Sequence, residues 1–131
     1  REKIQTYALD RIRDISITEN KFTLPADVDF ESYYDDCFGI ITDNNISTEK
    51  LLIKVGNYQA AYIKALPLHG SQKVVKSDAD YTLFEYFIKP TYDIRQEILS
   101  HGDDVEVLQP EWFREEIAAI VRKQEEIYKN E

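Results

Sequence analysis

The pattern of apolar and polar positions is most regular from residue 49 onward. Apolar side chains stand at every second position, at Leu51, Ile53 and Val55, and this period of two predicts a β-strand that begins at Glu49. A helix is expected to begin at Gly56-Asn57 and to end before Pro67, because proline disfavours the helical conformation of the residue before it. The apolar face of this predicted helix consists of Ala61, Tyr62, Ala65 and Leu66.

Two further strands are predicted between residues 72 and 89. Residues 72–76 form the first, residues 77–80 form a polar turn, and residues 81–89 form the longest strand, which is rich in aromatic side chains. One face of the long strand holds Tyr81, Leu83 and Phe87, and the other holds Phe84, Tyr86 and Ile88. A sheet with helices on one side needs only one apolar face. We therefore expect the second face to be covered by the last helix, by a partner chain or by a ligand.

The C-terminal third of the chain predicts two helices that flank a short strand. Thr91 can cap a helix that contains Ile94, Ile98 and Leu99, and Gly102 occupies the position of a left-handed C-cap. Val105 and Val107 predict the strand, and Pro110 begins a long helix, since proline is tolerated in a first turn. One face of that helix holds Phe113, Ile117, Ile120 and Val121.

The order of elements from residue 49 is therefore β-α-β-β-α-β-α. The first six elements have the order of the ferredoxin-like fold, in which a four-stranded antiparallel sheet carries both helices on one face. We predict an α+β fold: a ferredoxin-like βαββαβ sandwich with an additional C-terminal helix.

The residues before 49 are less regular. Residues 4–9 alternate as a short strand, and three isoleucines at alternating or nearby positions predict extended structure to about Thr18. Two strands are not stable without partners. We therefore expect them to be the terminal strands of a small β-barrel whose other strands lie elsewhere in a longer protein. Asp27 is expected to cap a short helix that runs to Asp36.

The composition fits one compact domain, or a small domain with an attached fragment, since 43% of the 131 residues are hydrophobic. No apolar run approaches the roughly 20 residues that cross a bilayer, and the first residues do not form a signal peptide. The one cysteine, Cys37, lies among aromatic residues, which indicates a buried thiol; a reactive thiol is the alternative. One cysteine and two distant histidines form no metal cluster, so we expect no metal, no cofactor and a cytoplasmic location.

The net charge of −9 argues against direct binding of duplex DNA, because the DNA backbone is itself a polyanion. The charge is uneven along the chain. Residues 1–14 hold four basic and three acidic side chains, so an anionic ligand is best accommodated there.

His69 and Ser71 invite a catalytic interpretation, because a nucleophilic serine needs a base within reach and a third group that orients the base. Both residues stand on a predicted turn, and we favour a structural role for them. The carboxylates fall at turns and helix ends without a spacing that implies an acid–base pair. We therefore predict that the chain is not an enzyme.

Two strings of residues carry a resemblance to a known family. The first is Tyr7-Ala8-Leu9-Asp10-Arg11-Ile12, and the second runs from Ile98 to Arg114 and includes Ser100-His101-Gly102-Asp103 and Gln109-Pro110-Glu111-Trp112-Phe113. Together they resemble the end of a WYL domain and its C-terminal extension, called WCX. Such tails belong to bacterial transcription regulators with an N-terminal helix-turn-helix.

The resemblance implies three parts: residues 1–24 as the end of a WYL-like barrel, residues 25–48 as a connector with a short helix, and residues 49–131 as a ferredoxin-like WCX-type domain. It also implies ligand sensing near the first string, with candidates Gln5, Tyr7, Arg11 and Arg13. Asp10 and Arg11 can instead form a structural ion pair or cap. Many family members have arginine where this chain has Gln5, which removes a donor suited to phosphate.

Three hypotheses of function follow. The first is the non-enzymatic effector-sensing and dimerisation region of a helix-turn-helix regulator, which forms a homodimer and meets DNA only through another domain. Its effector is unknown, with a nucleotide or nucleic acid as candidates, and Tyr81, Leu83 and Phe87 are its candidate partner-facing residues. The second is a stand-alone ferredoxin-like ligand-binding or dimerisation module. The third is a small enzyme that uses His69 and Ser71.

Overall fold

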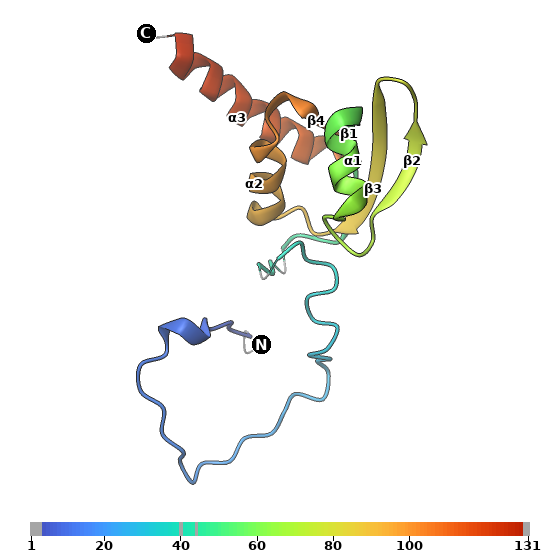
Figure 1. The fold of residues 1–131 in the computed structure, drawn as a ribbon. Coiled ribbons are helices and arrows are strands. Elements are labelled where there is room, and N and C mark those ends of the chain that lie inside the picture. The colour runs from blue at the N-terminus through green and yellow to red at the C-terminus, as the bar shows by residue number, and fades with distance from the viewer. Residues whose placement is uncertain (1–3, 40, 44, 130–131) are drawn as a thin grey trace.

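The computed structural model describes residues 4–39, 41–43 and 45–129 (Figure 1). It is a mixed α+β structure in which a four-stranded antiparallel sheet packs with three α-helices. All of these strands and α-helices lie in residues 49–129. The α+β class predicted from the alternation of apolar residues is therefore confirmed.

The elements follow one another in the predicted order. They are β1 (Glu49–Gly56), α1 (Asn57–Ala65), β2 (Lys73–Ser77), β3 (Tyr81–Ile88), α2 (Tyr92–Ser100), β4 (Val105–Gln109) and α3 (Glu111–Lys129). A short 3-10 turn, Gly102–Asp104, precedes β4. Gly102 has a φ of 59°, the left-handed conformation predicted for it, which glycine adopts without the steric cost of a side chain.

The sheet has the strand order β2-β3-β1-β4, and all neighbouring strands are antiparallel. β1 lies in the middle and pairs along its whole length with β3, from Glu49 opposite Ile88 to Gly56 opposite Tyr81. α1 connects β1 to β2, and α2 connects β3 to β4. Both helices therefore bridge strands that are not adjacent in the sheet.

The core lies between the sheet and the helices. Every second residue of β1 and β3 points to this side, as the alternation predicted, and the helices add one or two residues each. The buried core residues are Leu51, Ile53, Val55, Ala60, Ile63, Phe84, Tyr86, Ile88, Ile94, Ile98, Val107 and Phe113. Burying one large apolar side chain contributes about 1.5–3 kcal/mol, so this cluster is the main stabilising feature.

The predicted apolar face of α1 is wrong. Ala60 and Ile63 are the buried residues of this helix, whereas Tyr62 and Leu66 are exposed. Tyr62 instead meets Tyr58 on the outer face, where the two rings lie 5.5 Å apart at an interplanar angle of 66°. A helix of nine residues with apolar side chains on several sides offers two possible stripes. The sequence pattern alone did not decide between them.

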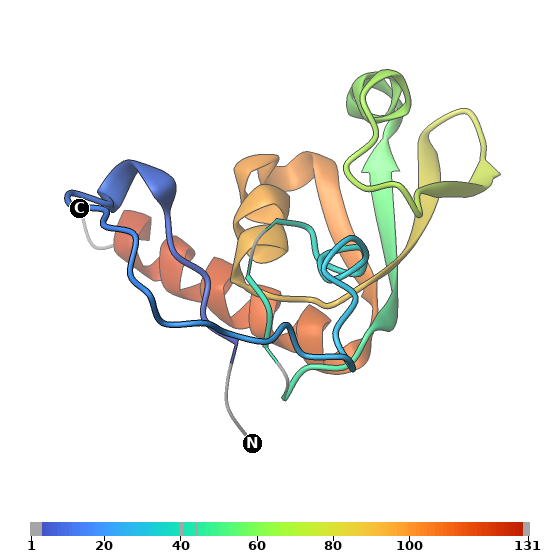
Figure 2. The same ribbon diagram turned by 90° about the horizontal axis from the view of Figure 1, so that it is seen from below.

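α3 lies on the helix side of the sheet, beside β4 and α2 (Figure 2). Its Phe113 is fully buried in the core, and Arg95 of α2 forms an ion pair with Glu116 of α3 at 2.6 Å. Arg114 donates a hydrogen bond of 2.5 Å to the backbone carbonyl of Val107 in β4. α3 therefore does not cover the open face of the sheet. Of the three alternatives given for the cover of that face, the last helix is wrong.

The segment before β1 contains neither a strand nor an α-helix among its described residues. The two strands expected up to Thr18 are absent, and the barrel-strand part of the predicted fold class is wrong for this chain. Residues 4–27 are all exposed, with one 3-10 turn at Leu9–Arg11. The chain offers these residues no partner strand, and an unpaired strand has no ladder of hydrogen bonds to stabilise it.

The short helix expected from Asp27 to Asp36 is also wrong. Residues 30–36 form successive turns instead. The Asp29 carboxylate accepts hydrogen bonds from the backbone N–H of Glu31 and the hydroxyl of Ser32, at 3.0 and 2.8 Å. Such local bonds from an aspartate compete with helix formation, because they satisfy the backbone in a turn conformation.

Candidate functional site

The candidate residues fall in three regions: the N-terminal segment, the open face of the sheet, and the turn between α1 and β2. In the N-terminal segment, the Tyr7 hydroxyl donates a 2.5 Å hydrogen bond to the side-chain carbonyl of Gln5. Tyr7 and Arg11 line a shallow hollow of about 450 Å³, and neither Gln5 nor Arg13 lines it. The structure thus brings together only part of the predicted ligand-binding set.

Arg11 and Arg13 are exposed, and within the described part of the chain neither forms an ion pair. The ion pair between Asp10 and Arg11, one of the two interpretations of this dipeptide, is not formed. Among the residues that the structure describes, these two exposed guanidinium groups have no carboxylate partner, and such groups can contact an anion.

The open face of the sheet combines aromatic rings with lysines. Phe87 is 53% exposed, and Tyr81 and Leu83 are half-buried. The ammonium groups of Lys54 and Lys76 lie 4.7 and 5.7 Å from the centre of the Tyr81 ring, within the range of cation–π attraction. Lysine side chains thereby shield part of the apolar surface that the three predicted partner-facing residues present.

Glu85 makes this face more polar than the sequence suggested. It lies in the middle of β3 on the same side as Phe87 and pairs with Lys50 of β1, with Nζ and the carboxylate oxygen 3.5 Å apart.

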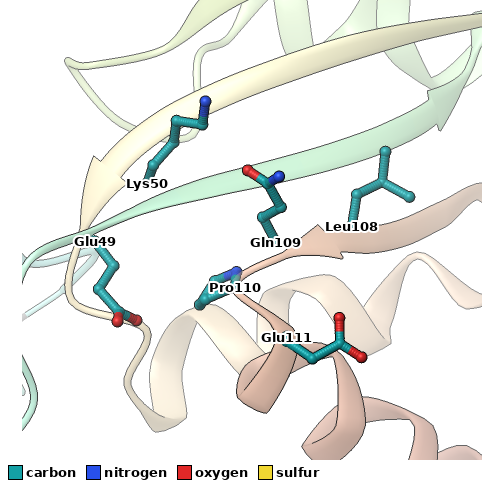
Figure 3. Close-up of a pocket in the computed structure, with 6 residues that line it drawn as sticks. All are labelled: Glu49, Lys50, Leu108, Gln109, Pro110 and Glu111. Atoms are coloured by element: carbon teal, nitrogen blue, oxygen red, sulfur yellow. The ribbon is translucent and has the colours of Figure 1, made fainter.

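At one end of the sheet a hollow of about 490 Å³ forms where β4 leads into α3 (Figure 3). Its lining mixes acidic, basic and amide side chains: Glu49, Lys50, Gln109 and Glu111, together with Leu108 and Pro110.

The turn between α1 and β2 is the most completely hydrogen-bonded of the three regions. Nδ1 of His69 accepts the backbone N–H of Ser71 at 3.1 Å and lies 2.8 Å from the Ser71 hydroxyl. Because Nδ1 accepts a hydrogen bond from an amide N–H, the neutral ring carries its own proton on Nε2. Nε2 then donates to the backbone carbonyl of Asp35 at 2.8 Å.

Ser71 lies two residues before β2 and continues the pairing with β3 on that side. Its hydroxyl oxygen accepts the backbone N–H of Phe87 at 2.9 Å, the kind of bond that a neighbouring strand would otherwise supply. Catalytic activation requires a group that orients the histidine and stabilises its cation, usually a carboxylate. Here a main-chain carbonyl stands at that position. These contacts favour the structural role expected for His69 and Ser71.

Sequence reasoning missed the part played by Gln72. Its amide group donates to the carbonyl of Ile63 at 3.0 Å and accepts both the backbone N–H of Leu68 and the hydroxyl of Tyr86, at 3.1 and 2.8 Å. Gln72 therefore satisfies polar groups at the end of α1 and in the core side of β3. The partners lie four, nine and fourteen residues away from Gln72, and no local motif signals them.

Residues 35–37 are joined to the domain by a set of contacts that we call the connector junction. The carbonyl of Asp35 accepts Nε2–H of His69, and the carbonyl of Asp36 accepts the backbone N–H of Lys89 at 2.7 Å. The Asp36 carboxylate accepts the Thr48 hydroxyl at 2.6 Å and lies 3.7 Å from the Lys89 ammonium. His69 and Lys89 of the domain thus hold residues 35 and 36, and Thr48 joins Asp36 to the residue before β1.

The electrostatics of the connector junction follow from partial burial. Burial would raise the pKa of Asp36, but the hydrogen bond from Thr48 and the charge of Lys89 outweigh it and lower that pKa. Cys37 is buried, and burial together with the negative charge of Asp36 raises its pKa to about 11. A thiol held in its protonated form is a poor nucleophile, which favours the interpretation of Cys37 as a structural residue.

The described residues also bear on metal binding and membrane insertion. No group of three His, Cys, Asp or Glu side chains in the described ranges is placed to hold a metal ion. Among the same residues, no helix has both the length and the apolar character needed to cross a membrane.

A family model matches the chain over residues 47–124, from just before β1 to within α3. The model is that of the WCX domain, the C-terminal extension of WYL-domain regulators. The match includes the string from Ile98 to Arg114 and excludes the string from Tyr7 to Ile12. No curated protein matches the chain.

Proposed function

Because the chain belongs to the WCX domain family, we propose that it is the non-enzymatic regulatory region of a bacterial helix-turn-helix transcription regulator. In this proposal the chain assembles as a homodimer in the cytoplasm and takes part in effector sensing. DNA is bound by another domain of the protein, since the net charge of −9 disfavours contact between this chain and phosphates. The strand order β2-β3-β1-β4, with both crossover helices against one face, supports assignment to the ferredoxin-like class.

The observation that carries the proposal beyond family membership is the connector junction. A signal can pass from the part that senses to the part that responds through a network of hydrogen bonds and ion pairs. Here the connector backbone at Asp35 and Asp36 is bound by His69 after α1 and by Lys89 after β3, and the Asp36 carboxylate is bound by Thr48 before β1. A shift of the upstream segment therefore acts directly on three elements of the WCX domain.

The effector proposed for the upstream segment is anionic, of the nucleotide or nucleic-acid class. Arg11 and Arg13 supply exposed guanidinium groups, and residues 1–14 hold four basic and three acidic side chains in a chain whose net charge is −9. Guanidinium groups bind phosphates through two parallel hydrogen bonds, which gives both energy and direction. Gln5 and Tyr7 are already bonded to each other and would supply neutral contacts beside them.

The test is made on the product of the complete gene. We expect the reading frame upstream of Arg1 to encode a winged helix and a Trp-Tyr-Leu string, and the complete protein to retard DNA from its own promoter in gel electrophoresis. Residues 1–131 alone should leave the same DNA unretarded. If the complete gene encodes no DNA-binding domain, the regulator proposal fails and a stand-alone module becomes the better account.

A further inference from the structure

The second half of α3 contains apolar side chains that no described part of the chain covers. Val121, Ile127 and Tyr128 are 49%, 69% and 78% exposed, and residues 121–129 are all exposed. In Figure 1 this end of α3 extends away from the sheet. A helical end of this length is marginal in water by itself, since isolated helices shorter than about 12–15 residues are barely stable.

The exposed residues continue the same stripe that anchors α3 to the core. Phe113, Ile117, Ile120, Gln124 and Ile127 follow one another at alternating spacings of four and three residues, the repeat of a coiled-coil seam. Phe113 and Ile117 pack against the core of the domain. The remaining positions, with Val121 and Tyr128 beside them, form what we call the distal stripe: Ile120, Val121, Gln124, Ile127 and Tyr128.

A groove of about 300 Å³ lies beside the distal stripe, between α3 and the edge strand β4. Val105, Ile117, Ala118 and Val121 make its floor largely apolar, and Arg114 and Arg122 stand at its rim. The same helix thus carries a set of projecting apolar side chains near its C-terminal end and an apolar groove about two turns earlier.

We propose that the distal stripe is the contact through which two copies of this chain associate, by antiparallel pairing of their α3 helices. The inference rests on the homodimer of the proposed function and assigns its surface. A two-fold axis near Arg122 places Ile127 of each copy beside the groove residue Ile117 of the other and sets Ile120 against Gln124. A contact of this kind is self-complementary, as the symmetry of a dimer requires.

Local charge permits a second copy as the occupant. The chain has a net charge of −9, yet residues 122–129 hold three basic and two acidic side chains, so two copies can approach there without the general repulsion. Antiparallel pairing also brings the C-terminal end of each α3, with its partial negative charge, toward Arg114 of the other copy. Gln124 provides one polar layer in the seam, a feature that fixes register at some cost in affinity.

The test compares the masses of single variants of residues 1–131 by sedimentation equilibrium over a range of concentrations. We expect a concentration-dependent dimer for the wild type, and a Kd raised at least about tenfold by Ile127→Asp, because each dimer loses two apolar contacts and gains two buried charges. Gln124→Leu should lower the Kd, a gain that a purely local role of this exposed residue would not produce. Leu66→Asp is the matched control: Leu66 is exposed and directly follows α1, away from α3, and its replacement should leave the Kd unchanged.

Circular dichroism at low concentration checks that each variant is folded. Phe87→Asp separates this inference from an interface on the open face of the sheet. If the wild type remains monomeric at all concentrations, both the dimer and its assigned surface are wrong. If dimers persist in Ile127→Asp, the homodimer stands but the distal stripe is not its contact, and their loss in Phe87→Asp would assign the contact to the open face.

Discussion

Replacement of Phe113 by alanine tests how α3 is attached to the domain. Phe113 is 0% exposed and belongs to the core cluster, so its truncation removes a complete aromatic ring from the interior. Such truncations cost about 3–5 kcal/mol, against a total stability of about 5–15 kcal/mol for a small domain. Since 1 kcal/mol corresponds to about 4–8 °C in a domain of this size, Phe113→Ala should lower the Tm by at least about 12 °C.

The neighbouring residue gives a matched comparison. Trp112 is larger than Phe113 but is 42% exposed, and its indole N–H donates to the Glu49 carboxylate at 2.7 Å. Because much of this ring stays in contact with water, Trp112→Ala should cost about 1–2 kcal/mol, clearly less than Phe113→Ala. Glu115→Ala, on the exposed side of α3, should change the Tm by less than about 2 °C. Thermal unfolding followed by circular dichroism at low protein concentration measures all three. An equal or larger effect at Trp112 would mean that α3 is rotated from the orientation described.

Three further predictions concern the connector junction and the charge of the chain. Asp36 has a lowered pKa in the folded state, so its contribution to stability is present above the ordinary pKa of 3.8 and is lost as the pH falls below it. Asp36→Asn should therefore lower the free energy of unfolding at pH 7, measured in urea, and have a much smaller effect at pH 3. The control is Asp35→Asn, which keeps the backbone carbonyl that His69 contacts and should have little effect at either pH. Cys37, with a pKa of about 11, should react with iodoacetamide at pH 8 only when the domain is unfolded; rapid labelling of the native protein would show that the thiol is accessible. Residues 1–131 at micromolar concentration should not retard duplex DNA in about 150 mM salt, and a shifted band would contradict the charge argument.

The regular part of the fold could be predicted from the sequence because burial imposes a period. Leu51, Ile53 and Val55 point to the core from β1, so alternation was sufficient to identify that strand, whereas β3, which is apolar on both faces, was identified by its aromatic residues. The position of Gly102 after α2 was sufficient to predict its left-handed conformation. At these positions the local pattern and the tertiary structure require the same residue.

The remaining features depend on partners that are distant in the sequence. His69 binds the carbonyl of Asp35, and Gln72 binds the hydroxyl of Tyr86, and neither contact has a local signature. The N-terminal strands were expected from alternation alone, but a strand forms only when another strand pairs with it. On α1, the choice between the stripe of Ala60 and Ile63 and that of Tyr62 and Leu66 was made by the packing of the helix on the sheet.

The most direct measurement of the regulatory role is a promoter–reporter assay on the complete gene. Removal of residues 47–129, which contain the WCX domain, should abolish regulation of the reporter while the protein remains present in the cell. His69→Ala, which breaks one contact of the connector junction, should alter reporter expression at least about twofold, whereas His101→Gln, at the end of α2, should behave as the wild type. Normal regulation after removal of the domain would contradict the proposal that this region controls the regulator.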